Sequence, residues 1–264
     1  MRINPIKKER IDRLLVDRGY VQSRERARGL IMAGMVIAGE KKIEKIGIKI
    51  SEDTEIRVLG NDIPYVSRGG VKLASAITEF RLDLNGKAAM DIGASTGGFT
   101  DCLLQHGVKK VYAIDVGYGQ LAWKLRQDKR VINIERTNIR NIDREMIDDD
   151  IDIITIDLSF ISLKKVISGI LGFLKDRGEI IALIKPQFEA GKSDVGKGGI
   201  VRSEEIHKRV LNEIKRFTEK LGLTTIGIIP SPISGRKGNQ EYLIYLNQIC
   251  DYSSNTEQGV PKTL

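Results

Sequence analysis

The chain has 264 residues, of which 41% are hydrophobic and 30% are charged, a composition typical of a globular protein that can bury a full core. Its apolar runs are far shorter than the roughly 18 to 20 residues that a spanning helix needs, and none follows the basic start. We therefore expect no membrane span, no signal peptide and a cytoplasmic location. The two cysteines form no CxxC pair, and the chain has only two histidines. No metal site of the Cys/His type is therefore expected.

The net charge of +8 is concentrated near the start of the chain. Residues 1–50 contain 13 Lys and Arg against 6 Asp and Glu, an excess of +7 that leaves only +1 for all the other residues. Such a concentration predicts a small basic module with a polyanionic partner. It favours nucleic acid as that partner over the alternative of a merely soluble basic domain.

Residues 1–60 are predicted to form this module from two short helices followed by a small sheet. The first helix, within residues 10–20, carries its leucines and isoleucine on one face. The second helix opens with Ser23, a good N-cap, and closes on Gly34, a good C-cap. The turn-rich residues 61–66 form the predicted linker. Two short strands are expected around a lysine-rich stretch, at 35–39 and 54–60.

From residue 67 onward, strands and helices alternate. The strands are continuous apolar runs, which is typical of parallel strands that are covered on both faces. We therefore predict a doubly wound α/β domain over residues 67–250, with a mostly parallel sheet and an antiparallel last strand. The polar residues 251–264 are predicted to be a flexible tail. Seven strands are expected, at 87–93, 110–115, 131–135, 151–158, 178–185, 223–230 and 241–247.

A glycine-rich turn, "MDIGASTGGFT", joins the first strand of this sheet to a helix. Glycines there let the backbone approach a ligand closely, and the helix start offers free N–H donors. A dinucleotide fingerprint needs a middle glycine, and Ser95 stands in that position, so the pattern fits S-adenosylmethionine better than a nicotinamide dinucleotide. Asp115 closes the second strand, where its carboxylate could hold ribose hydroxyls or cap a helix. The predicted contacts in the turn are Asp91, Gly93, Ser95, Gly97 and Gly98.

The sequence "AGKS" at 190–193 invites comparison with a phosphate-binding P-loop. That motif requires a second glycine five residues before the glycine of "GKS". The chain has Pro186 at that position, so we reject the motif. The surrounding lysines and glycines are predicted to form a mobile loop beside the site, with a plain solvent loop as the alternative.

Four charged residues, two of each sign, are predicted to converge beside the glycine-rich turn. Asp157 ends the fourth strand and Lys185 ends the fifth, while Glu241 begins the antiparallel last strand, and active groups gather at this edge of an α/β sheet. Lys72 lies in the helix before the first strand and can point to the same edge. Each alone could be a cap or a salt bridge. Together they indicate function, because burying such pairs costs several kcal/mol of desolvation.

The motifs "SRGGVKL", "DIGASTGGFT", "IDLSFISL", "IKPQFE" and "GNQEYL" together resemble the TlyA-like ribosomal RNA methyltransferases. Members of that family join an S4-type RNA-binding domain to an FtsJ-like methyltransferase domain, and the resemblance covers nearly the whole chain apart from the tail. It implies that a Lys-Asp-Lys-Glu tetrad, here Lys72, Asp157, Lys185 and Glu241, transfers a methyl group to a ribose 2′-hydroxyl. It also implies cytidine in ribosomal RNA as the target.

The resemblance further implies that S-adenosylmethionine is the cofactor and that it contacts the glycine-rich turn, Asp115, Asp157 and Asn138, the last near the adenine. Whether Lys185 acts as a base or as an orienting donor stays open, because a base must be neutral part of the time. A non-catalytic RNA-binding or haemolysin-like protein and a nicotinamide-dependent oxidoreductase are the alternatives. The predicted RNA contacts are Arg10, Arg13, Arg18, Arg24, Arg26, Arg28, Lys41, Lys42 and Arg68.

Overall fold

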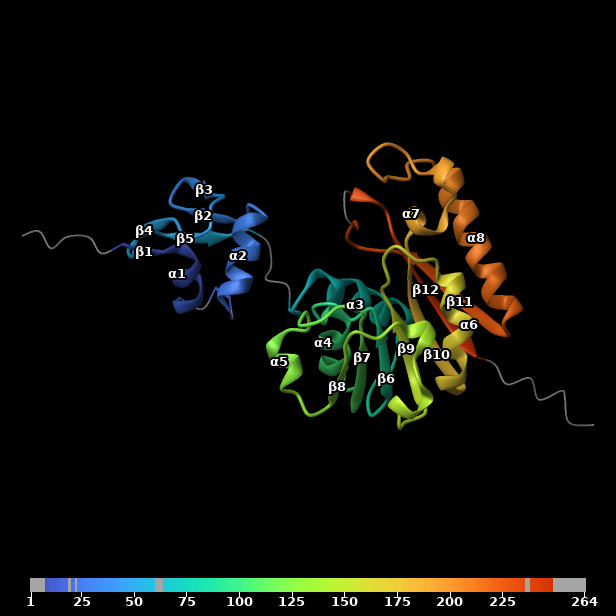
Figure 1. Ribbon diagram of the computed structural model, residues 1–264. Helices are drawn as coiled ribbons and strands as arrows, with labels where there is room; N and C mark the ends of the chain where they lie inside the picture. Colours follow the sequence, from blue (N-terminus) through green and yellow to red (C-terminus); the bar gives the residue numbers. More distant parts are fainter. Residues whose placement is uncertain (1–7, 19, 22, 60–63, 236–237, 249–264) are drawn as a thin grey trace, which may run out of the picture. The chain divides into compact units, whose positions relative to one another are not determined.

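The computed structural model describes residues 8–18, 20–21, 23–59, 64–235 and 238–248 (Figure 1). The chain divides into two compact units, residues 1–63 and 64–264. The predicted tail and residues 61–63 of the predicted linker lie outside the described residues.

Residues 64–66, predicted as linker, are part of the second unit. The Pro64 carbonyl accepts a hydrogen bond from Gln105 Nε2 at 3.0 Å, and the Val66 amide donates to Asp101 Oδ2 at 2.8 Å. Tyr65 between them is buried. The second unit therefore begins before the glycines of "SRGG", because the preceding chain is anchored on the helix that follows the glycine-rich turn.

The first unit contains two helices and two small antiparallel sheets. Strands β2, β3 and β5 form a three-stranded sheet in the order β3-β2-β5, and β1 pairs with β4. An apolar core, which includes Leu15, Ile31 and Val36, joins the helices to the strands. The elements are β1 (Lys8–Arg10), α1 (Ile11–Asp17), α2 (Arg24–Met32), β2 (Val36–Ala38), β3 (Lys41–Ile43), β4 (Lys49–Ser51) and β5 (Ile56–Val58).

The local signals in the first unit act as predicted at the second helix. Ser23 Oγ accepts a hydrogen bond from the Arg26 amide at 3.2 Å, and Gly34 takes a left-handed φ of 66° just after α2. The strands β1, β3 and β4 are additional to the two predicted ones. Their three-residue length and their lysines hid them, because short exposed strands show no apolar alternation.

The second unit is built on a seven-stranded sheet in the order β11-β12-β10-β9-β6-β7-β8. The strands β8, β7, β6, β9 and β10 are parallel, whereas β12 is antiparallel to both of its neighbours. The predicted doubly wound fold with an antiparallel last strand is thus confirmed. The strands are β6 (Ala88–Ile92), β7 (Lys110–Ile114), β8 (Val131–Ile134), β9 (Ile151–Ile156), β10 (Leu174–Ile184), β11 (Leu223–Pro230) and β12 (Tyr242–Gln248).

Helices cover both faces of this sheet (Figure 1). On one face, residues of α6 and α8 such as Ile167 and Ile214 join the same core cluster as Ile154 of β9. On the other face, Phe80 of α3 packs against Tyr245 of β12 with ring centroids 5.1 Å apart. The helices are α3 (Arg68–Phe80), α4 (Gly98–Gln105), α5 (Trp123–Arg126), α6 (Ile167–Ile170), α7 (Pro186–Glu189) and α8 (Glu204–Lys220). Short 3₁₀ turns lie at Ile139–Asn141, Arg144–Met146, Leu163–Lys165, Leu171–Phe173 and Lys192–Asp194.

The topology brings the ends of four strands to one edge of the sheet. The parallel neighbours β6, β9 and β10 end just before Gly93, Asp157 and Lys185. Ile184 pairs with Tyr242 in the antiparallel ladder, so Lys185 and Glu241 stand at the same end of adjacent strands. In the described part of the chain, none of the helices combines the length and hydropathy of a membrane span.

Candidate active site

Two buried ion pairs lie at this edge of the sheet. Lys72 Nζ lies 2.5 Å from Glu241 Oε2, and Lys185 Nζ lies 2.5 Å from Asp157 Oδ1. The side chains of Lys72 and Lys185 are 10% exposed, that of Glu241 is 3% exposed and that of Asp157 is 23% exposed. The four residues come from α3, from β12 and from the ends of β9 and β10, as the strand-end argument predicted.

Each ion pair also contacts one neutral side chain. Lys185 Nζ donates to Ser159 Oγ at 3.2 Å, while its contact with Asp157 lies outside hydrogen-bond geometry. Gln187, two residues further along, donates to Glu241 Oε1 at 3.4 Å. The chain segment that carries Lys185 therefore also contacts the other pair, through the Gln187 side chain.

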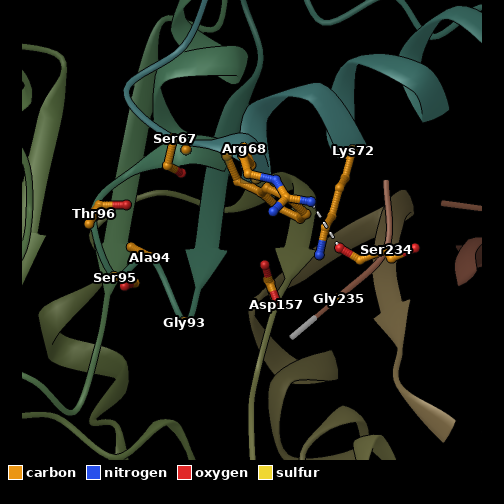
Figure 2. A pocket seen from close by; sticks show the side chains of 13 residues that line it. Ser67, Arg68, Lys72, Gly93, Ala94, Ser95, Thr96, Asp157, Ser234 and Gly235 are labelled. Atoms are coloured by element: carbon orange, nitrogen blue, oxygen red, sulfur yellow. Dashed lines mark hydrogen bonds between the residues drawn. The ribbon is translucent and has the colours of Figure 1, made fainter. Parts of the chain in front are cut away.

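A cavity of about 250 Å³ opens between the start of α3 and the glycine-rich turn. Figure 2 shows that the side chains of Lys72 and Asp157 both extend into it. Arg68 lies across the cavity and donates to the Ser234 carbonyl at 3.1 Å (Figure 2). One member of each ion pair thus lines the cavity, and Glu241 and Lys185 contact these two residues. The lining is completed by Ser67, Gly69, Gly93, Ala94, Ser95, Thr96, Gly98, Phe99 and Gly235.

The glycines of the turn allow backbone contacts that a larger residue would prevent. Gly93 has a φ of 83°, and a Cβ there would lie 2.5 Å from the Asp157 carbonyl oxygen. A Cβ on Gly98 would lie 2.2 Å from Ser67 Oγ. Gly97 has a φ of 92° and packs against Leu121 and Leu125, so it shapes the turn without lining the cavity. The turn consequently lies directly against the end of the strand that carries Asp157.

Asp91, a predicted cofactor contact, lies underneath the turn instead of in the cavity. It is fully buried and accepts hydrogen bonds from Thr100 Oγ1 at 2.6 Å and from Thr155 Oγ1 at 3.1 Å. Burial away from water raises the pKa of its carboxyl group to about 7. Asp91 thereby ties the start of α4 to β9, and its role in the structure is to position the turn.

Asp115 directly follows β7, and Asn138 lies four residues after the end of β8. Asp115 is partly exposed and accepts hydrogen bonds from the amides of Ser95, at 2.9 Å, and of Gly117, at 2.7 Å. It does not cap a helix, because the next helix along the described chain, α5, begins only at Trp123. Asn138 accepts a hydrogen bond from the Arg140 amide at 3.1 Å and so begins a 3₁₀ turn.

The predicted RNA contacts occupy different surroundings. In the first unit, Arg10, Arg24 and Arg28 gather around Asp12. Arg13 lies 3.5 Å from Glu9 of β1 and 3.6 Å from Asp17 of its own helix, and Arg18 donates to the Thr54 carbonyl at 2.8 Å. Arg68 belongs to the second unit, at the cavity. The remaining three are Arg26 on α2 and the exposed Lys41 and Lys42 on β3.

Several residues at the site were not singled out from the sequence. Phe160 is 82% exposed with a left-handed φ of 66°, and its ring lies 5.0 Å from that of Phe188. These two aromatic residues follow Asp157 and Lys185 by three positions each and border a second hollow with Arg140 and Lys165. The signal was available, because both lie within the motifs "IDLSF" and "IKPQF", but an aromatic residue in such a motif is more often part of a core. Ser159, Gln187 and Gly235 were also not singled out, because they carry no charge that would mark them in the sequence.

The residues present fit a nucleoside cofactor with an amino-acid end. Gly93, which has no side chain, lets the backbone of the turn line the cavity. The carboxylate of Asp157 also lines the cavity, and the carboxylate of Asp115 is partly exposed next to the turn. Among the described residues, no group of three His, Cys, Asp or Glu could hold a metal ion. Sheet order, turn and charged tetrad together define a methyltransferase of the Rossmann-like class.

The model of the FtsJ-like methyltransferase family matches residues 65–248, and the chain belongs to this family. A Bacillus subtilis protein named "Putative rRNA methyltransferase YqxC" is 48% identical over 91% of this chain and 86% of its own length. The "16S/23S rRNA (cytidine-2'-O)-methyltransferase TlyA" of Mycobacterium tuberculosis is 41% identical over 93% of this chain and 92% of its own. A solved structure, "Putative hemolysin from Streptococcus thermophilus", is 42% identical with a TM-score of 0.74 over 93% of this chain and 90% of that one.

These findings confirm the predicted family, the enzyme class and S-adenosylmethionine as the methyl donor. They set aside the nicotinamide-dependent oxidoreductase, which the serine at position 95 had already disfavoured. The S4-type assignment of the first unit and the roles of the individual site residues stay predictions.

Proposed function

We propose that this protein transfers the methyl group of S-adenosylmethionine to the 2′-hydroxyl of a cytidine ribose in ribosomal RNA. The observation that carries the proposal is the meeting of two buried Lys-carboxylate pairs at a cavity against the glycine-rich turn. The names of relatives that share at least 41% of their residues over nearly the whole chain support the substrate class.

The residues of the site match the demands of this reaction. When bound, S-adenosylmethionine supplies a methyl group on a positively charged sulfur, which leaves as a neutral thioether. A ribose hydroxyl is a weak acid, so the protein has to align its oxygen and accept or guide its proton. Lys72 and Asp157, at the cavity, would contact the hydroxyl, and alignment of this kind can contribute several kcal/mol.

Lys185 would take the proton from the hydroxyl or orient it. Its amine lies 2.5 Å from Asp157, so a donor held there can orient the hydroxyl oxygen, whereas a base must be neutral at the moment it accepts the proton. Glu241 would hold Lys72 in place through its ion pair.

The RNA would be held at two kinds of surface. The basic first unit, as an S4-type domain, would bind phosphates, and this part of the affinity should fall steeply with salt. The exposed ring of Phe160 beside Asp157 offers a face on which a base can stack, with Arg140 and Lys165 close by for phosphates. Ribosomal subunits in the cytoplasm are the proposed physiological substrate.

The test is to incubate the protein with labelled S-adenosylmethionine and purified ribosomal subunits, and then to map the label. We expect label in RNA at a position that resists alkaline cleavage, because a methylated 2′-oxygen cannot attack the adjacent phosphate. Label on a nucleotide that alkali still cleaves would assign the methyl group to a base and would contradict the proposal.

Gly235 provides a test of the Lys72–Glu241 pair that leaves both charges in place. A Cβ at this position would lie 2.0 Å from Glu241 Oε1, whereas the backbone there is not left-handed. We expect Gly235→Ala to displace the carboxylate and to lower kcat at least about tenfold, equivalent to about 1.4 kcal/mol in the barrier, with little change in melting temperature. Wild-type turnover in this variant would show that the position of Glu241 does not matter for the reaction.

A further inference from the structure

Asp12 is a fully buried carboxylate in the basic first unit, on helix α1. Three arginines from two elements converge on it. Arg10 donates to it from Nε at 2.9 Å and from Nη2 at 3.1 Å, and Arg24 donates from Nη2 at 2.8 Å and from Nε at 3.3 Å. Arg28 Nε lies 3.8 Å from the same carboxylate. One anion thus organises three cations that come from β1 and α2.

Each of the three arginine side chains contacts Asp12 and is also partly exposed to solvent. Their side chains are 40%, 49% and 50% exposed, while the carboxylate that joins them is inaccessible. Hydrogen bonds from Arg10 lower the pKa of Asp12 to about 2, so the carboxylate stays charged at neutral pH. Asp12 and the three arginines together carry an excess of two positive charges, of which the neighbouring Glu9 offsets a part at Arg10.

A structural role alone does not account for this arrangement. A single bidentate arginine would give each oxygen of the carboxylate one hydrogen bond, and neutral donors could fill the remaining acceptor positions without adding charge. Additional arginines at the same carboxylate lose side-chain freedom and repel each other, which is a cost unless a further anion binds them. Planar guanidinium groups fixed next to one another match the oxygens of phosphate groups.

We propose that Asp12 is a positioning residue that fixes Arg10, Arg24 and Arg28 as a preformed binding surface for phosphates of the RNA backbone. This inference rests on the proposed function in one respect, namely that the first unit binds RNA. Asp12 itself contacts no RNA. Because Asp12 already holds the three arginines in place, they lose less conformational entropy when they bind phosphates.

For the effect of removing the Asp12 charge on RNA affinity, this inference predicts the opposite of what net charge alone predicts. Removing an anion from a surface that binds a polyanion should strengthen binding, if only net charge matters. We expect Asp12→Asn to weaken binding of purified ribosomal RNA about tenfold, because the arginines lose their common anchor. Asp17→Asn is the matched control: Asp17 is on the same helix, 56% exposed and 3.6 Å from Arg13. This control should bind RNA as tightly as wild type or more tightly.

A second substitution keeps the test valid if Asp12→Asn disturbs folding. Arg24→Lys retains the charge but cannot donate to Asp12 from two nitrogens, so we expect several-fold weaker RNA binding at unchanged melting temperature. Arg57→Lys, at an exposed position on β5, is its control and should bind like wild type. Filter binding of full-length protein across a salt series measures all variants, and the affinity for S-adenosylmethionine reports on the integrity of the second unit.

The binding data distinguish RNA binding by the three arginines from the positioning role of Asp12. RNA affinity that survives replacement of Arg10, Arg24 and Arg28 together by alanine would overturn RNA binding by this surface. Affinity that is lost in that triple variant but is unchanged or increased in Asp12→Asn, with Arg24→Lys also unchanged, would overturn the positioning role of Asp12 alone.

Discussion

Replacing Lys185 by alanine is expected to lower the rate of methyl transfer at least about a hundredfold, within the range that a positioned proton-transfer group contributes. The reason is that the Lys185 amine lies 2.5 Å from Asp157, whose side chain reaches the cavity. S-adenosylmethionine should still bind, because Lys185 is not among the residues that line the cavity at the glycine-rich turn. Single-turnover methylation of ribosomal subunits, with calorimetry for the cofactor, measures both quantities.

The substitution Lys185→Arg separates the two roles left open for this residue. Arginine keeps a positive donor next to Asp157 but is never neutral in a protein, so it cannot accept the proton. Activity as low as that of the alanine variant indicates a base, and substantial residual activity indicates an orienting donor.

Lys175→Ala is the matched control for Lys185→Ala. Lys175 is on the same strand, β10, and forms an ion pair with Asp152 at 2.7 Å, at the far edge of the sheet. The control should methylate like wild type. Full activity of Lys185→Ala itself would remove this lysine from the mechanism.

The convergence of the four charged residues could be predicted from sequence because topology determines it. Once the strands are recognised as parallel, the residues that follow them must share an edge, and an antiparallel last strand brings its first residue to the same place. Which lysine pairs with which carboxylate could not be predicted, because that depends on where α3 lies against β12. The structure pairs Lys72 with Glu241 and Lys185 with Asp157.

Burial of individual carboxylates was the main feature that sequence could not provide. Asp91 and Asp115 both accompany the ends of strands beside the turn, yet Asp91 is inaccessible and Asp115 is partly exposed. The difference arises because two threonines far apart in sequence, Thr100 and Thr155, close over Asp91. Asp12 is a similar case, since the arginines that surround it come from other elements.

Gly93→Ala is expected to weaken binding of S-adenosylmethionine by about 30-fold or more, corresponding to about 2 kcal/mol. Two effects act at this position, one on stability and one on the cofactor site. Alanine in a left-handed conformation costs about 1 kcal/mol of stability, and its Cβ would lie 2.5 Å from the Asp157 carbonyl oxygen, beside the cavity. Neither partner can yield easily, because the Gly93 amide donates to the Ile114 carbonyl at 2.9 Å and the Asp157 amide donates to the Ile92 carbonyl at 2.9 Å. The turn must therefore move away from Asp157, and calorimetry measures the lost affinity.

Gly86→Ala isolates the conformational part of this effect. Gly86 has a φ of 71°, close to that of Gly93, but a Cβ there would meet nothing within 4 Å. It precedes β6, whereas Gly93 follows the same strand, so the two substitutions test the same backbone conformation at opposite edges of the sheet. The control should lose about 1 kcal/mol of stability and none of its cofactor affinity. If Gly93→Ala also retained full affinity for S-adenosylmethionine, the close approach of the turn to Asp157 could not be what shapes the cofactor site. The reason is that the added methyl group must displace the turn from Asp157.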